Sequence, residues 1–285
     1  MQLVKLRSII NEFSQLSNAW FWVSIERDVL TVTGSDAKSY LHSQLSQDIA
    51  SMQPGDVRTS LLLQPTGKVD SLFRVICAAA DRFVLDCDPG FGESTVARLS
   101  RFKIRVNADI ELQRQTWRAV RTTSSVAGLT EIGQPLDVSG AISAWRGDGT
   151  AFDIFSPTMT LPTTVREGTH SEFEASRVRS MWPVMGVDIT TEMIPAETSV
   201  VDVAVSFTKG CYPGQELVER MDSRGSIGPR RLCRVTCAPG VKVGDEVVVD
   251  SEIVGVYTTV AGINALALIK RGVDISDPYG ENQTL

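Results

Sequence analysis

In the first part of the chain, the spacing of hydrophobic residues fits a strand in some segments and a helix in others. VLTVTG alternates as a strand does and stops at Gly34, after which Ser35 can cap a helix. RTSLLLQPTGKVDSLFRVICAA predicts a hairpin, because two β-rich runs flank a Pro-Thr-Gly turn at 65–67. RFVLDC continues the meander, followed by an expected helix at about 93–102 and a strand near 104–112. This order predicts an α+β layer, with helices against one face of an antiparallel sheet.

The middle of the chain again mixes strand and helix patterns, whereas the C-terminal part has strand patterns alone. TWRAVRTT, AISAWR and TAFDIFSP have the pattern of strands, and SEFEASRVRSMW has the pattern of a helix. After Arg224 the chain contains only short β-rich runs, separated by Pro-Gly and Gly-Asp turns. This part predicts a small all-β barrel or sandwich, with a boundary near 223–229.

The N-terminal segment has a different pattern. Its apolar residues recur at helical spacing and predict an amphipathic helix or arm: Leu3, Leu6, Ile10, Phe13 and Leu16. Charged residues interrupt it and no small-residue cleavage site follows, so we do not interpret it as a signal peptide.

Composition narrows the function classes. The 285 residues are 42% hydrophobic and 22% charged, as is usual for a globular protein, and no apolar run approaches the roughly 20 residues of a membrane span. The net charge of −6 argues against binding to a nucleic-acid backbone, which favours a basic face. Five cysteines, an odd number, are spread over a long chain, which predicts reduced thiols and a cytoplasmic location.

The candidate ligands for a metal are few. The chain has two histidines, His42 and His170, and neither stands at ligand spacing from a second His or Cys, so no metal site is predicted. Cys233 and Cys237 fall on one face of a strand and are predicted to be core residues rather than ligands. Cys77 and Cys87 lie in apolar strands and receive the same interpretation.

Several enzyme classes lack their motifs in this sequence. There is no G-x-S-x-G nucleophile elbow, no G-x-x-x-x-G-K-[ST] phosphate loop and no G-x-G-x-x-G dinucleotide loop. Most hydrolases, kinases and nicotinamide enzymes are therefore not expected.

The segment FTKGCYPGQELVER, residues 207–220, contains the candidate chemistry. Gly210 and Gly214 free the backbone on both sides of Cys211, so the segment can form a tight loop. Lys209 next to Cys211 can lower the pKa of the thiol, but no histidine lies nearby in sequence to act as a base. Gln215 and Glu216 offer the donors and acceptors that suit the edge of a heterocycle. From chemistry alone, a structural turn and a functional site are equally good interpretations.

The residues 209–216, KGCYPGQE, are similar to the signature K-G-C-[FY]-x-G-Q-E of the YgfZ family. These are folate-binding proteins related to the T-protein (aminomethyltransferase) of the glycine cleavage system. VTGSDAKSYLHSQLSQDI resembles the opening motif G-x-D-A-x-x-F-L-x-x-x-x-T-x-D-[VI] of the family. RVRSMWPVMGVDI resembles its R-x-x-x-G-x-P-x-x-G-x-D motif, although Met181 and Trp182 replace the usual Gly context. With IPAE at 194–197, the resemblance extends from about Val29 to Lys270.

The resemblance implies a three-domain cloverleaf of the α+β class. An N-terminal helical arm, 1–27, would precede two interleaved ferredoxin-like domains at about 28–115 and 116–224. A C-terminal antiparallel β-barrel at 225–285 would follow.

The resemblance also implies a cofactor, tetrahydrofolate or another reduced folate, in a central cavity. Phe152-Asp153-Ile154 is similar to the family's [FY]-[DE]-[IL] strand, whose carboxylate reads the pterin ring. Cys211 would be the catalytic residue, and the folate-binding residues would be Asp153, Lys209, Gly210, Tyr212, Gly214, Gln215 and Glu216. Without the resemblance, the alternating pattern favours Asp153 as an outward residue of a half-buried strand.

One departure from the T-protein concerns its chemistry. The T-protein has a pair of aspartates after its hairpin turn, whereas this chain has Ser71-Leu72, with Asp70 one position early and on the opposite face of the strand. This argues against aminomethyl transfer. We therefore expect a tetrahydrofolate-binding accessory protein that supports iron–sulfur cluster assembly or repair, including enzymes that modify tRNA. Its expected partners are iron–sulfur client or assembly proteins, and the alternative is an aminomethyltransferase or other one-carbon transferase.

Overall fold

The computed structural model describes residues 20–122, 140–145, 151–159, 161, 163, 165–223 and 228–275. The amphipathic helix expected within residues 3–16 and the centre of the expected boundary at 223–229 lie outside these ranges. The chain divides into two compact units, each assembled from three separate stretches. The first unit comprises Met1–Tyr40, Ala50–Thr59 and Phe73–Ser176, and the second comprises Leu41–Ile49, Ser60–Leu72 and Arg177–Leu285.

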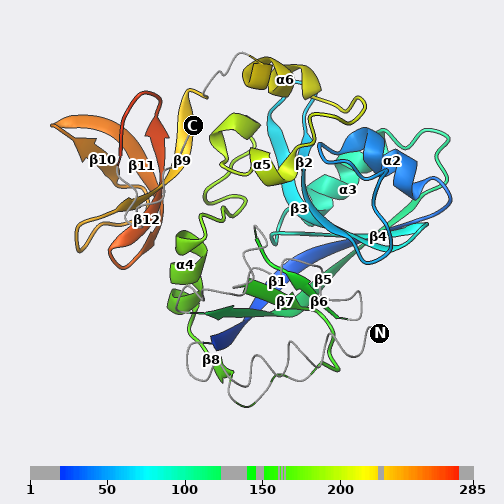
Figure 1. Ribbon diagram of the computed structural model, residues 1–285, viewed down its shortest axis with the longest axis horizontal. Helices are drawn as coiled ribbons and strands as arrows, with labels where there is room; N and C mark the ends of the chain where they lie inside the picture. The colour runs from blue at the N-terminus through cyan, green and yellow to red at the C-terminus, as the bar shows by residue number, and fades with distance from the viewer. Residues whose placement is uncertain are drawn as a thin grey trace. The chain divides into compact units, whose positions relative to one another are not determined.

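An eight-stranded sheet contains all the strands before residue 170 that the structure describes. Its members are β1 (Trp20–Thr33), β2 (Val57–Leu63), β3 (Val69–Ala79), β4 (Arg82–Cys87), β5 (Asp109–Thr122), β6 (Ala141–Ser143), β7 (Ala151–Ile154) and β8 (Arg166–Glu167). The order is β2-β3-β4-β1-β5-β7-β6, with β8 paired in parallel to β1 (Figure 1). The pairs β1–β4, β1–β5, β3–β4, β5–β7 and β6–β7 are antiparallel, which confirms the predicted α+β class.

Two strands are longer than their sequence patterns indicate. β1 begins at Trp20, so residues 20–27, which the sequence assigned to the arm, are part of the sheet. β5 is one continuous strand and joins two segments that the sequence treated separately, across the expected domain boundary at 115. β1 and β5 pair along their whole length, from Trp20 opposite Thr122 to Thr33 opposite Asp109. This long-range pairing extends both strands beyond what a local pattern reveals.

The helices predicted at about 35–45, 93–102 and 171–182 are present as α2, α3 and α4, and the structure adds η2, α5 and α6. Their bounds are α2 (Ala37–Gln44), α3 (Gly92–Arg101), α4 (His170–Arg179), α5 (Val201–Ala204) and α6 (Gln215–Ser223), with a short 3₁₀ helix, η2, at Pro195–Glu197. At the start of α3 the Asp28 carboxylate accepts hydrogen bonds from the backbone N–H groups of Gly90 and Gly92, at 2.8 and 3.0 Å. Among the described residues, no helix has the length and apolar character needed to cross a membrane.

The C-terminal segment forms a second, four-stranded antiparallel sheet. It contains β9 (Arg230–Thr236), β10 (Glu246–Val249), β11 (Glu252–Ala261) and β12 (Asn264–Lys270), in the order β10-β11-β12-β9 (Figure 1). Cys233 and Cys237 are buried in its apolar core together with Val235 and Tyr257. This confirms the prediction that these two cysteines are core residues.

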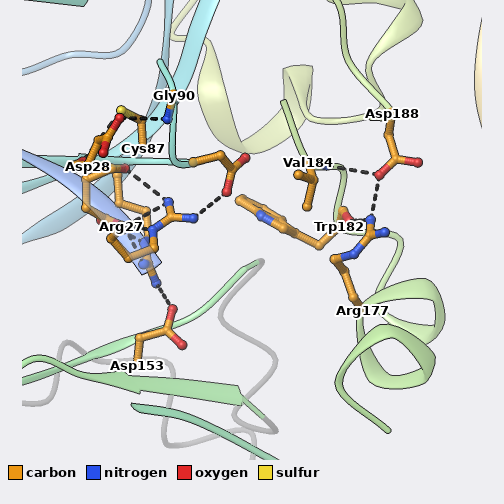
Figure 2. A network of polar contacts seen from close by, with 12 residues as sticks. Arg27, Asp28, Cys87, Gly90, Asp153, Arg177, Trp182, Val184 and Asp188 are labelled. Atoms are coloured by element: carbon orange, nitrogen blue, oxygen red, sulfur yellow. Dashed lines mark hydrogen bonds and ion pairs between the residues drawn. The ribbon is translucent and has the colours of Figure 1, made fainter. Parts of the chain in front are cut away.

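A buried ion pair fixes the end of α4 within the second unit. Arg177 Nη1 lies 2.5 Å from Asp188 Oδ2 and donates to the Trp182 carbonyl at 2.8 Å (Figure 2). Asp188 also accepts hydrogen bonds from the Val184 N–H, at 3.0 Å, and from the Thr259 hydroxyl, at 2.8 Å. The spaced Arg and Asp of the RVRSMWPVMGVDI motif thus join the end of α4 to strand β11.

Met181, which replaces the family's glycine, occupies the position after the helix end that favours a left-handed backbone. Its φ is 50°, and the N–H groups of Met181 and Trp182 bond to the Val178 and Arg177 carbonyls, as in a Schellman cap. Its side chain packs against the apolar cluster of Val178, Leu232 and Leu266. Contact with that cluster offsets the strain that a glycine would avoid.

We predict that Asp188→Asn lowers the free energy of unfolding by about 3–5 kcal/mol, because it leaves the Arg177 guanidinium buried without its counter-charge. Urea unfolding would measure the loss. Asp109→Asn is the matched control, since the Asp109 side chain is 86% exposed and its change should alter stability by less than about 0.5 kcal/mol. Equal stability of the two variants would contradict a structural role for the pair.

Candidate functional site

The Cys211 loop joins α5 to α6 in the second unit and ends against the β2–β3 turn. Gly214 has φ +81°, and a Cβ on it would lie 2.6 Å from the Gln64 carbonyl oxygen. Gly67, with φ +85°, is in close contact with α6, because its Cβ would lie 2.7 Å from the Leu217 side chain. Two glycines therefore let the turn and the start of the helix approach more closely than any side chain would permit.

Gly210, by contrast, is not required by the backbone. Its φ lies outside the left-handed range, and the nearest heavy atom to a Cβ placed on it is His42 Nε2, at 4.0 Å. That distance is an ordinary van der Waals contact, so an alanine would fit. The fold gives no steric reason for a glycine at this position.

Lys209 anchors the beginning of the loop to the end of α2. Its ammonium donates to the carbonyl oxygens of His42 and Leu45, the latter at 2.5 Å, and lies 4.8 Å from the centre of the Tyr212 ring. Burial lowers the pKa of Lys209 to about 8, although the charges of Asp48 and Cys211 raise it. The Lys209 amine is therefore still mostly protonated at pH 7. Its positive charge interacts electrostatically with Cys211.

Tyr212, Gln215 and Glu216 complete the signature. Tyr212 is buried, and its burial raises the pKa of the phenol to about 12. Gln215 closes the first turn of α6, because its Oε1 accepts from the Tyr212 N–H at 3.3 Å and its Nε2 donates to Glu219. Glu216 is exposed. Their predicted contacts with folate stay a prediction.

Cys211 differs from the other cysteines in its exposure. All five cysteines lie in the described ranges, and Cys211 is exposed whereas the other four are buried. Burial raises the pKa of the Cys87 thiol to about 12 and also raises those of Cys77 and Cys237. The thiolate is the reactive form, so these three strand thiols are poor nucleophiles.

His42 lies beside this loop although it is far away in the sequence. It belongs to the last turn of α2, and its Nδ1 lies 3.4 Å from Asp48 Oδ1. Burial and the charge of Lys209 lower the pKa of His42, whereas Asp48 raises it. No histidine lies near Cys211 in the sequence, but the fold brings His42, 169 positions earlier, beside Gly210.

Asp153 lies in the first unit, within a buried network of charges on strands β1, β3, β4, β5 and β7. Arg74 donates to both carboxylate oxygens of Asp86, at 3.0 and 2.6 Å, and to Asp153 Oδ2 at 2.6 Å. Arg27 donates to Asp86 Oδ2 at 2.9 Å and pairs with Asp88 (Figure 2). Each buried carboxylate thus has a guanidinium partner, as burial of charge requires.

A second arginine reaches Asp153 from the other side. Arg121 Nη2 lies 2.8 Å from Asp153 Oδ1, and the guanidinium also lies over the Trp145 ring at 4.2 Å from its centre. Burial raises the pKa of Asp153, but the charges of Arg121 and Arg74 outweigh it, so the pKa is lowered and the carboxyl stays ionised. With 3% of its surface exposed, Asp153 does not face solvent, and the interpretation as an outward residue is wrong.

One carboxylate oxygen of Asp153 retains acceptor capacity. Although Oδ1 lies close to Arg121, it makes no hydrogen bond with any described residue, since the N–H does not point at it. The 2.8 Å between Arg121 Nη2 and Asp153 Oδ1 makes the two groups an ion pair. Because no N–H group of a described residue is aligned with Oδ1, the lone pairs of this oxygen accept no hydrogen bond. An ionised carboxylate with an unused oxygen fits the chemistry of a pterin's N–H donors.

The two residues that the sequence resemblance aligns with the T-protein's aspartates are buried. Ser71 and Leu72 are 0% and 3% exposed on β3, while Asp70 is half-buried. Ser71 Oγ has no hydrogen-bond partner among the described residues. This strand therefore presents neither carboxylate of the pair.

Among the described residues, no group of three or more His, Cys, Asp or Glu side chains could hold a metal ion. The structure brings Lys209, Gly210, Cys211 and His42 together in the second unit. Asp153 belongs to the first unit.

Comparison with known proteins gives related sequences. The chain is 26% identical over 231 residues to the tRNA-modifying protein YgfZ of Vibrio vulnificus, covering 74% of this chain and 68% of that protein. It is 21% identical over 237 residues to the tRNA-modifying protein YgfZ of Colwellia psychrerythraea, covering 77% and 72%. No family model matches. The resemblance to the YgfZ family is confirmed.

The fold of this YgfZ-like chain is similar to that of a solved structure. The crystal structure of glycine cleavage system aminomethyltransferase T from Bartonella henselae matches with a TM-score of 0.71 over 92% of this chain and 81% of that one. Sequence identity is 17%, so the likeness concerns the fold alone. The fold is therefore that of the aminomethyltransferase.

The two glycines that flank Cys211 should respond differently to substitution. We predict that Gly214→Ala lowers the free energy of unfolding by at least about 2 kcal/mol, because of its positive φ and its contact with Gln64. Gly210→Ala should change it by less than about 0.5 kcal/mol. Urea unfolding of both variants checks this, and a large loss in Gly210→Ala would refute the interpretation that this position has room.

Proposed function

We propose that this YgfZ-like chain binds a reduced folate, tetrahydrofolate or a relative, and supports the assembly or repair of iron–sulfur enzymes, including those that modify tRNA. In this proposal it is a cytoplasmic accessory protein whose partners are iron–sulfur client or assembly proteins. Its layout is two interleaved ferredoxin-like domains and a C-terminal barrel. The discontinuous stretches of the two compact units support the interleaving.

The state of Asp153 carries the folate part of the proposal. Asp153 is buried and is kept ionised by Arg121 and Arg74, yet its Oδ1 makes no hydrogen bond with a described residue and can still accept one. A ligand with N–H donors would satisfy this oxygen. Asp153 would hold the amine edge of the pterin, and the folate would supply a carrier for a one-carbon unit.

The exposure of Cys211 supports a reactive thiol. Of the alternatives that the loop chemistry leaves open, a purely structural turn explains Gly214 and Gln215, which make the close contacts. It does not explain an exposed cysteine beside a glycine that the fold does not need. We therefore assign Cys211 as the reactive residue.

Aminomethyl transfer is the second candidate, and the fold similarity to aminomethyltransferase T favours it. Against it, β3 carries the buried Ser71 and Leu72 where the T-protein has two aspartates. An accessory role for the bound folate fits this strand better than aminomethyl transfer does.

The folate part is tested by calorimetry and thermal melting with tetrahydrofolate. We expect binding heat and a raised Tm for the wild type, and affinity about tenfold weaker or lower still for Asp153→Asn, because a charged acceptor is lost. Asp86→Asn is the matched control, since it disturbs the same buried network through Arg74 without changing Asp153. Absence of binding to the wild type at millimolar folate, or equal loss in both variants, would refute a folate contact by Asp153.

The thiol part is tested with Cys211→Ser, which nearly preserves volume. We expect the variant to keep its stability and its folate affinity but to lose support of iron–sulfur enzymes in a complementation assay. Alkylation of each cysteine, mapped by mass spectrometry, should show Cys211 as the fastest thiol. Full complementation together with slow alkylation of Cys211 would mean that the residue belongs only to a turn.

A further inference from the structure

His42 is held in a defined orientation at the end of α2. Its Nδ1 lies 3.4 Å from Asp48 Oδ1, and both side chains are partly buried. A carboxylate beside Nδ1 keeps the proton of a neutral imidazole on that nitrogen. The lone pair is then on Nε2, which makes Nε2 the proton acceptor of this ring.

Lys209 holds the Cys211 loop beside this imidazole. Lys209 donates to the backbone carbonyls of His42 and Leu45, which ties the residue at the start of the loop to the helix end that carries His42. One residue later, the position of a Cβ on Gly210 lies 4.0 Å from His42 Nε2. The proton acceptor of the ring therefore faces the peptide that leads directly into Cys211.

The charges around His42 keep it able to accept a proton. Among the described residues, the charged groups that shift its pKa are Asp48, from the segment after α2, and Lys209, from the loop. Burial and Lys209 lower its pKa, and Asp48 opposes them without reversing the shift. The imidazole is therefore mainly neutral at pH 7, which a general base requires.

We propose that His42, oriented by Asp48, is the general base and acid that serves Cys211, with Gly210 keeping the space between them open. The inference rests on the proposed assignment of Cys211 as the reactive residue. His42 Nε2 accepts the proton of the Cys211 S–H, directly or through one water molecule, and the thiolate attacks the electrophilic atom of a substrate. A bond forms to sulfur, the bond to the leaving group breaks with its electron pair, and the imidazolium returns the proton to that group.

The proposal explains why position 210 is a glycine. A methyl group there would fit beside the ring without straining the backbone, but it would occupy the space through which a proton or a water molecule passes. Gly210→Ala should therefore be stable and chemically impaired. If the glycine had a purely structural role, Gly210→Ala would instead be less stable and would keep the reactivity of Cys211.

The first test is the rate of alkylation of Cys211 by iodoacetamide between pH 5 and 9, followed by mass spectrometry. In this probe reaction the S–C bond forms, iodide leaves, and the thiol proton passes through His42 to water. We expect His42→Gln to slow Cys211 at pH 7 by at least about tenfold. The wild-type rate should also rise through an inflection below pH 6.5, which the variant lacks.

The matched control is His170→Gln, because the other histidine of the chain is 84% exposed and packs beside Glu174. It should alkylate as the wild type does. If His42→Gln unfolds, Asp48→Asn and Gly210→Ala provide the same test. Each should lower the alkylation rate of Cys211 severalfold without changing the Tm. Added imidazole should restore part of the rate to His42→Ala.

A second measurement uses the fact that the chain has only two histidines. In NMR titrations, alkylation of Cys211 should change the pKa of His42 and leave that of His170 unchanged. Wild-type rates in His42→Gln, together with no change in the His42 titration, would overturn this inference while Cys211 remains the fastest thiol. If Cys211 in the wild type were no faster than the buried cysteines, the thiol part of the proposed function would fail as well.

Discussion

The buried charge network of the first unit is the interaction on which its sheet depends. Arg27, Arg74 and Arg121 face Asp86, Asp88 and Asp153, so positive and negative charges balance across five neighbouring strands. Burial of any one of these groups alone would be prohibitive, because the interior cannot replace its hydration. The network therefore requires that β3, β4, β1, β5 and β7 assemble together in one register. The same constraint keeps Asp153 ionised inside the protein.

In the second unit, close backbone contacts at two glycines, rather than a network of charges, position the Cys211 loop. Gly67 and Gly214 let the β2–β3 turn meet the start of α6. Lys209 ties the other end of the loop to the carbonyls of His42, in α2, and Leu45, directly after it. Between these anchors the chain exposes Cys211 next to a glycine that has no packing role. A loop held at both ends by the scaffold places its middle residues accurately, which is what a reactive thiol needs.

The similarity to aminomethyltransferase T therefore separates into two parts. The fold is shared. In this chain a structural Arg177–Asp188 pair joins α4 to the C-terminal sheet. On β3 this chain carries the buried Ser71 and Leu72, which the sequence resemblance aligns with the two aspartates of the T-protein. One fold can support different chemistry, because the scaffold and the reactive groups vary separately.

The sequence by itself determined the elements whose signals are local. The hairpin at 57–79, the helices α2, α3 and α4 and the C-terminal strands follow from apolar spacing and turn residues, and the turn before α6 follows from Gly214. Only the tertiary structure decided the full lengths of β1 and β5, the burial of Asp153 and the place of His42 beside Gly210. Each of these depends on a partner more than 30 residues away. A local pattern reports which face of an element is apolar, but it does not report which distant charge neutralises a buried carboxylate or which helix end meets a loop.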